Sequence, residues 1–197
     1  MIKKALTSLV LTTALVTGAV AVPGMTQTPA AEANFVAPLY KQTDSRWSAD
    51  LMGGGGTIGS EGCVITSVAM ALAHKGITIS GATTTPKNFN TWLKGNGGYS
   101  GDNLVWGAVP KLNSSRITFQ GRYYGGTSTS GSLSSATLRS YLDAGNKAII
   151  AQVRGGAHWV LLTGHNGGLI FACNDPGYSN TSYANTDFTG FAVYTIN

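Results

Sequence analysis

The hydrophobic pattern changes along the chain, and this change constrains the fold more than any other feature of the sequence. The first half carries apolar residues at helical spacing, most clearly over residues 64–75, and the second half carries short strand-like runs. Residues 64–75 are apolar on nearly every face, which is typical of a buried helix. The sequence therefore predicts an α+β protein with a central helix packed on an antiparallel sheet.

Capping residues predict three further helices. Thr85 and Pro86 form an N-cap followed by proline at the first helical position, and Gly95 ends that helix. Asp102 is the expected cap of a short helix that runs to residue 109. A serine at 134 or 135 caps a third helix that runs to residue 143.

Five segments of the second half have strand composition: 117–124, 148–153, 158–164, 169–174 and 190–196. The third and fourth are joined by a turn that contains Asn166-Gly167, a dipeptide typical of two-residue hairpins. With these two residues as the turn, opposed positions sum to 333 and His158 faces Asp175. With Gly167-Gly168 as the turn, the sum becomes 335 and this pairing is lost.

The predicted pair of His158 and Asp175 has the chemistry of a catalytic base and its orienting group. Directly opposed residues of an antiparallel pair have Cβ atoms about 5 Å apart, close enough for a carboxylate to accept a hydrogen bond from an imidazole. Such a bond fixes the tautomer and the orientation of the ring, as the third member of a catalytic triad does.

Cys63 is the candidate nucleophile. It follows Gly62 and opens the predicted buried helix, where free backbone N–H groups and the helix dipole favour a thiolate. The N–H of Cys63 could also donate to an oxyanion. Cys173, the other cysteine, is expected opposite Val160 in the core. A Cys63–Cys173 disulfide is the alternative, because exported chains with two cysteines often form one.

The first 21 residues predict a secretory signal peptide, since a basic start precedes an apolar stretch that ends in small residues. A second candidate cleavage site follows Ala33. We expect residues 22–35 to form a short pro-segment or linker and residues 36–197 to form one domain. The protein is then secreted, outside the cell or in its envelope, without stable membrane association after cleavage.

The charge pattern argues against nucleic-acid binding. The formal net charge is +5, and removing Lys3 and Lys4 with the leader leaves 5 − 2 = +3, or +4 if Glu32 is also removed. No basic run or stripe remains in the rest of the sequence. No zinc or calcium motif occurs either, so the sequence predicts neither a metal nor another cofactor. We expect a monomer.

Four short motifs occur in order along residues 36–197. They are QTDSRW at 42–47, IGSEGC at 58–63, HWV at 158–160 and NDP at 174–176. Together they resemble the bacteriocin-processing-peptidase-like branch of the papain-like cysteine peptidases. The resemblance implies a two-lobed fold in which the cysteine starts a central helix and the histidine and aspartate lie on an antiparallel sheet.

The resemblance also implies a role for each matching residue. Cys63 is the nucleophile, and His158 is the base that later becomes the general acid. Asp175 orients the imidazole, and the side chain of Gln42 is an oxyanion donor. The implied activity is hydrolysis of peptide bonds in a peptide or protein substrate, through a thioester acyl-enzyme.

Two other classes of function remain open from the sequence. The same triad could serve an acyl transferase or a cell-wall peptide hydrolase. A non-catalytic exported binding domain would instead pair Cys63 with Cys173. Such a domain would use exposed aromatic residues, for which the candidates are Trp47, Trp92, Tyr123 and Tyr124.

Overall fold

The structure, a computed structural model, describes residues 29–124 and 133–197. The predicted signal peptide lies outside the described residues. The α-helices are α1 Ile58–Glu61, α2 Cys63–His74, α3 Pro86–Gly95 and α4 Ser135–Ala144, and the 3-10 helices are Trp106–Leu112, Arg154–Gly156 and Asn185–Asp187. The main strands are β6 Ile117–Tyr124, β7 Lys147–Val153, β8 His158–His165, β9 Ile170–Asn174, β10 Ser182–Ala184 and β11 Gly190–Ile196.

These strands form one antiparallel sheet in the order β10-β9-β8-β7-β11-β6, and the short strand β1 (Glu32–Ala33) pairs with the end of β8. Two small hairpins, β2–β3 (Thr78–Ile79 and Ala82–Thr83) and β4–β5 (Tyr99–Ser100 and Asn103–Leu104), lie on the helical side. The α+β architecture of a papain-like peptidase fold is confirmed.

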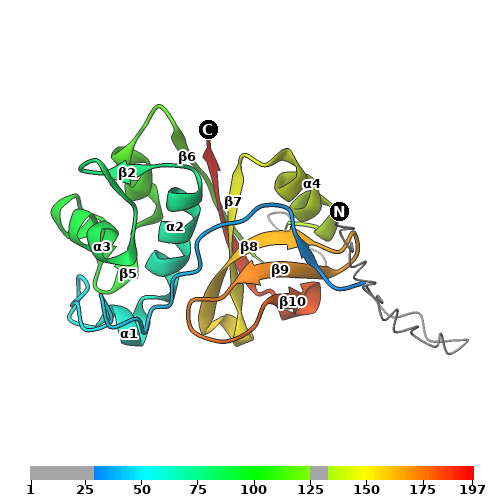
Figure 1. The fold of residues 1–197 in the computed structure, drawn as a ribbon, viewed down its shortest axis with the longest axis horizontal. Helices are drawn as coiled ribbons and strands as arrows, with labels where there is room; N and C mark the ends of the chain where they lie inside the picture. Colours follow the sequence, from blue (N-terminus) through cyan, green and yellow to red (C-terminus); the bar gives the residue numbers. More distant parts are fainter. Residues whose placement is uncertain (1–28, 125–132) are drawn as a thin grey trace, which may run out of the picture.

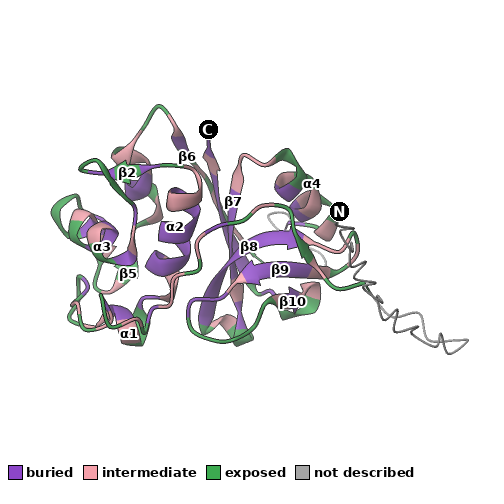
Figure 2. Ribbon diagram, viewed as in Figure 1, coloured by how far each residue is buried: buried purple, intermediate pink, exposed green. Residues whose placement is uncertain are grey.

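Helices cover both faces of the sheet. Alternate residues of β8 point to opposite faces, so Trp159 and Leu161 join the core under α2. Val160 and Leu162 join a second core under α4. Seven of the eight residues of β8 are therefore buried, and the strand has the colour of buried residues in Figure 2.

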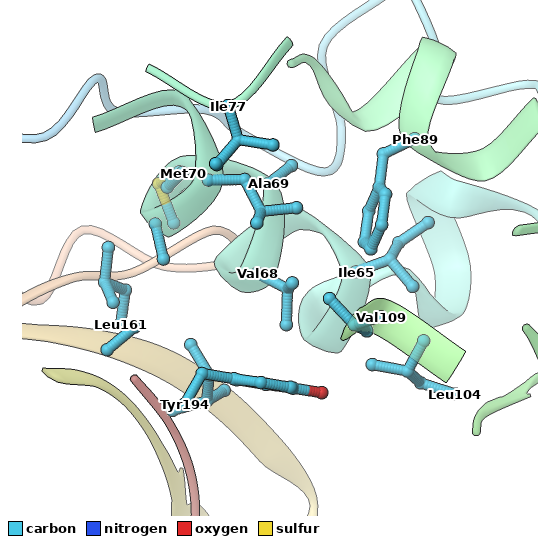
Figure 3. Packing of buried hydrophobic residues seen from close by; sticks show 14 of the residues in the cluster. Ile65, Val68, Ala69, Met70, Ile77, Phe89, Leu104, Val109, Leu161 and Tyr194 are labelled. Carbon is cyan, nitrogen blue, oxygen red and sulfur yellow. The ribbon is translucent and has the colours of Figure 1, made fainter. Parts of the chain in front are cut away.

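The α2 core explains why the predicted helix is apolar on nearly every side. Ile65 and Val68 pack in one cluster with Leu161 and Tyr194 of the sheet, and Phe89 of α3 belongs to the same cluster (Figure 3). All five side chains are at most 1% exposed. Full burial of such a side chain contributes about 1.5–3 kcal/mol, so the helix is held firmly against the sheet.

The capping predictions succeed for two helices and fail for one. Thr85 caps α3 in a capping box with Asn88, and Ser134 caps α4. The predicted helix from residue 102 to 109 is wrong, because the helical turn is a 3-10 helix over Trp106–Leu112. Asp102 instead accepts hydrogen bonds from the N–H groups of Gly54 and Gly56, which holds the glycine-rich loop to the β4–β5 hairpin.

The hairpin register with Asn166-Gly167 as the turn, a sum of 333, is wrong, and the pairs nearest the site have the alternative sum of 335. In β8 and β9 Leu161 pairs with Asn174, a sum of 335, and an irregularity shifts the register by one residue before Gly164 pairs with Ala172. Cys173 consequently faces Leu162 and not Val160.

No helix in the described part of the chain combines the length and the apolar composition that a membrane span needs.

Candidate active site

Helix α2 begins beside the start of β8, and this junction brings Cys63 to His158. One turn after Cys63, the buried hydroxyl of Ser67 donates to the carbonyl of Trp159 over 3.2 Å. Residues four apart lie on the same helix face, and His158 directly precedes Trp159. The bond therefore fixes the position of α2 along β8 and places Cys63 on the same side as His158.

The helix start itself depends on Gly62, the residue between α1 and α2. A Cβ on Gly62 would lie 2.5 Å from the carbonyl oxygen of Ile58 and 2.7 Å from its Cγ2. The glycine thus permits the close packing of two consecutive helices. Cys63 is the first residue of α2, so its N–H has no acceptor within the helix.

His158 and Asp175 form the expected pair despite the different register. The Nε2 of His158 and the Oδ1 of Asp175 are 2.7 Å apart, and both residues are buried. Asp175 lies one residue beyond the end of β9, so it meets the ring from the loop and not from a directly opposed strand position. The bond to Nε2 leaves Nδ1 without a partner among the described residues, and the neighbouring Cys63 side chain helps to raise the pKa of the ring.

The carboxylate of Asp175 is bound by four donors. Besides His158, its Oδ1 accepts from the N–H groups of Gly177 and Tyr178, each over 2.9 Å. Its Oδ2 accepts from the hydroxyl of Tyr183 over 2.8 Å. These bonds fix the orienting group before any substrate binds.

The pKa values of His158 and Asp175 are shifted in opposite directions. Burial alone lowers the pKa of His158, but its hydrogen bonds and charge interactions with Asp175 and Cys63 outweigh burial and raise this pKa to about 9. Burial alone raises the pKa of Asp175, but the bond from His158 and the three other donors lower it to about 2. An imidazolium beside a carboxylate is therefore the stable form at neutral pH.

Gln42 lies at the same junction and is buried. Its backbone N–H donates to Pro176 in the Asp175 loop, and its Nε2 donates to the carbonyl of Gly59 over 2.9 Å. A second N–H on Nε2 remains for another acceptor. A Cβ on Gly177 would lie 2.9 Å from Cε1 of His158 and 3.4 Å from Oε1 of Gln42, so only glycine lets the loop approach this closely.

Three residues that sequence reasoning missed support the Asp175 loop. The Nε of Arg154 donates to the hydroxyl of Tyr183 over 3.3 Å, and its guanidinium lies 3.6 Å from the ring centroid of Tyr178. The Tyr178 ring in turn contacts His158 edge-on, with centroids 4.9 Å apart. The ammonium of Lys41 donates to the carbonyls of Asp175 and Tyr178, each over 2.6 Å. Only Lys41, adjacent to Gln42 in the first motif, carried a local signal.

A cavity of about 790 Å³ opens onto these groups, within the usual size range of ligand sites. Gln42, Cys63 and His158 line it. Glu61 and Asp102 contribute from the helical side, and Trp159, Gln152 and Arg122 contribute from the sheet. All candidate residues except Asp175 thus face one cavity, with Asp175 buried behind the imidazole.

The binding-domain alternative finds no support in the structure. Cys63 and Cys173 are free thiols, so the disulfide it requires is not formed. Burial raises the pKa of the Cys173 thiol to about 12, and the side chain packs in the α4 core. Of the four aromatic residues it would use, Trp47 is buried, Trp92 and Tyr123 are half-buried, and Tyr124 alone is exposed. Residues 29–124 and 133–197 contain no group of three side chains that could hold a metal ion.

A thiol at a helix start, an imidazole and a carboxylate in one row, on a papain-like α+β fold, define the class of cysteine peptidases. The chain belongs to the Peptidase_C39 like family, whose sequence profile matches residues 36–195. No curated protein and no solved structure matches the chain.

Proposed function

We propose that this protein is an exported cysteine hydrolase of the bacteriocin-processing-peptidase-like branch, and that it cleaves peptide bonds. The observation that carries the proposal is that Cys63 and His158 line one cavity, and that His158 is bonded to Asp175 over 2.7 Å and has a pKa of about 9. A protonated imidazole at neutral pH stabilises a thiolate beside it, and the thiolate is the nucleophile of this chemistry.

The reaction follows from the position of each group. Cys63 Sγ attacks the carbonyl carbon of the substrate, and the oxyanion accepts hydrogen bonds from the Cys63 N–H and the free Nε2 hydrogen of Gln42. The oxyanion then collapses, the C–N bond breaks and His158 gives its proton to the leaving amine. Water attacks the thioester, His158 accepts a proton from it, and the acid leaves with Cys63 restored.

The same proposal includes the setting of the enzyme. Residues 1–21 are a signal peptide, residues 22–35 a pro-segment or linker, and residues 36–197 the catalytic domain of a secreted monomer. The support is the sequence pattern of the leader. Neither nucleic acid nor a membrane is part of the reaction.

Incubation of the protein with a mixed pool of peptides, read by mass spectrometry, tests the proposal. We expect new amine and carboxyl termini with the wild type and none above background with Cys63→Ala or His158→Ala. Cys173→Ala is the matched control and should retain cleavage, because Cys173 lies outside the cavity. New isopeptide bonds without free termini would identify an acyl transferase, and equal cleavage by Cys63→Ala would refute a thiol mechanism.

A further inference from the structure

The sheet-side wall of the cavity carries one positive charge that the proposed mechanism does not use. Arg122, near the end of β6, lines the same cavity as Cys63 and His158, and its side chain is exposed. An arginine held in a cleft beside a reactive group is suited to recognise an anion, because its guanidinium offers a rigid fork of N–H donors.

The strand register places Arg122 on the cavity face of the sheet. Leu161 pairs with Ile150, Ile150 with Ala192, and Ala192 with Arg122, and opposed residues share a face. The first three belong to the core under α2. Arg122 therefore projects on the α2 side, in the same cross-strand row, where the helix no longer covers the sheet.

Two tryptophan rings hold the guanidinium in this position. The Cζ of Arg122 lies 4.7 Å from the ring centroid of Trp159 and 5.3 Å from that of Trp106. Trp159 directly follows His158, and both rings line the cavity. Cation–π contacts leave the N–H edge of a guanidinium free to form hydrogen bonds.

Among residues 29–124 and 133–197, no carboxylate forms an ion pair with Arg122. Its guanidinium also has no hydrogen-bond acceptor among these residues. The acidic side chains of the cavity, Glu61 and Asp102, belong to its helical side. Asp102 is already bound by the N–H groups of Gly54 and Gly56. The two sides of the cavity thus carry opposite charges.

We infer that Arg122 is a subsite for a carboxylate of the peptide substrate, either an acidic side chain or the terminal carboxylate. This inference rests on the proposed function and adds the substrate class. A guanidinium pairs with a carboxylate through two parallel hydrogen bonds, so the subsite selects both charge and direction. The carboxylates of Glu61 and Asp102 disfavour the reversed placement, which fixes which end of the substrate lies over the sheet.

The cleavage-site profile of a peptide pool tests the inference. For the wild type, we expect aspartate and glutamate to be enriched about 10-fold at one position on one side of the cleaved bond, or enrichment of cuts at a fixed distance from the C-terminus. Repeating the digestion with an amidated pool separates the two sources, because amidation removes a terminal carboxylate and leaves acidic side chains unchanged.

Variants of the arginine give the decisive comparison. In Arg122→Gln the enrichment should fall to the pool average, and Arg122→Lys should keep part of it. Lys111→Gln, which removes a positive charge outside the cavity lining, should keep all of it. Each enrichment is a ratio within one protein, so a change in the amount of folded enzyme does not alter it. Enrichment that survives in Arg122→Gln, or a wild-type profile without acidic preference, overturns the inference.

A binding measurement separates this inference from the proposed function. Cys63→Ala protein, immobilised and washed with the same pool, should retain peptides with a carboxylate over their amide counterparts, and the added Arg122→Gln substitution should abolish the preference. Failure of hydrolysis with this preference intact would refute the proposed function alone. Hydrolysis without any carboxylate preference would refute the subsite alone.

Discussion

At the scale of single residues, the chemistry of the site depends on the buried ion pair between His158 and Asp175. The imidazole side chain is 6% exposed and the carboxylate is fully covered. Their mutual bond works against burial in both partners, so the pKa of one rises while that of the other falls. Removing either partner leaves the other buried without compensation, which is costly.

The first prediction concerns the alkaline limit of activity. In the wild type, the imidazolium is present below the His158 pKa of about 9 and is lost as the pH rises through it, so kcat/KM should fall there. Asp175→Asn removes the negative charge while burial remains. We expect the alkaline limb of its kcat/KM–pH profile to lie at least about one pH unit lower than in the wild type. The maximal kcat/KM should be reduced about 100-fold or more. An unmoved limb would show that Asp175 does not control the imidazole.

The second prediction concerns the donor behind the carboxylate. The Asp175 pKa is lowered from 3.8 to about 2, so its contacts stabilise the fold fully above pH 3.8, and this contribution is lost as the pH falls through about 2. Tyr183→Phe removes one donor and should lower the free energy of unfolding by about 1–3 kcal/mol at pH 7. Urea titrations should show this deficit shrinking towards pH 2.

Tyr141→Phe is the matched control, because the Tyr141 ring packs beside Lys147 and its hydroxyl forms no hydrogen bond in the described structure. It should cost little at either pH. A Tyr183→Phe deficit of the same size at pH 2 and pH 7 would mean that the hydroxyl contributes through packing and not through the Asp175 charge.

At the scale of elements, the loop after β9 shapes the site as much as the strands do. Residues 175–178 supply the carboxylate, two N–H donors and the ring that contacts His158. Lys41 and Gln42 bind this loop from the N-terminal segment. The orientation of the imidazole therefore depends on a loop that is held from both sides.

The third prediction tests this loop at Gly177. A Cβ there would lie 2.9 Å from Cε1 of His158, so Gly177→Ala should displace the imidazole and lower kcat/KM about 10- to 100-fold. Gly95→Ala is the control, since its Cβ would meet no atom within 4 Å. We expect Gly177→Ala to have the lower Tm in thermal denaturation, so kcat/KM is compared at a temperature well below both Tm values. Equal kcat/KM values for the two variants would rule out the steric argument.

Some elements of the fold could be predicted from the sequence and others could not. The apolar run after Cys63 predicted α2, and the capping residues predicted α3 and α4, because these signals are local. The β8–β9 register was not predictable from its turn. A Cβ on Gly164 would overlap the backbone of Glu32, so this glycine admits β1, a segment more than 100 residues earlier, next to the point where the register shifts.

The candidate site shows the same division. Its Cys, His, Asp and Gln followed from short motifs with recognisable chemistry. Arg154 and Tyr183 did not, because they meet Asp175 through the tertiary fold. β10, which presents Tyr183, has only three residues, too few for a periodic pattern. Arg154 adopts a left-handed backbone conformation, with φ 54°, for which its own side chain gives no sequence signal.

At the scale of the whole molecule, the N-terminal segment pairs with the end of β8 that lies away from the active site. Glu32 and Ala33 pair with His165 and Gly164, and the Asn34 side chain donates to Asp143. The segment then continues past α2 to Lys41 and Gln42 (Figure 1). Part of the predicted linker thus packs on the domain in the structure.

The fourth prediction follows from this contact. A chain that starts at residue 34 lacks β1 and should have a free energy of unfolding about 1–2 kcal/mol lower than a chain that starts at residue 22. Urea denaturation of the two purified chains measures the difference. Coincident unfolding midpoints would show that β1 does not contribute, and would make cleavage after Ala33 cost nothing in stability.

The central claim is that His158 activates the Cys63 side chain as a nucleophile. The most direct test is the rate of alkylation by iodoacetamide from pH 5 to 10, with the modified residue located by mass spectrometry. At pH 6 we expect Cys63 of the wild type to react at least about 100-fold faster than Cys63 of His158→Ala, and Cys173 to stay unmodified in both. Equal rates for the two proteins at pH 6 would contradict the claim.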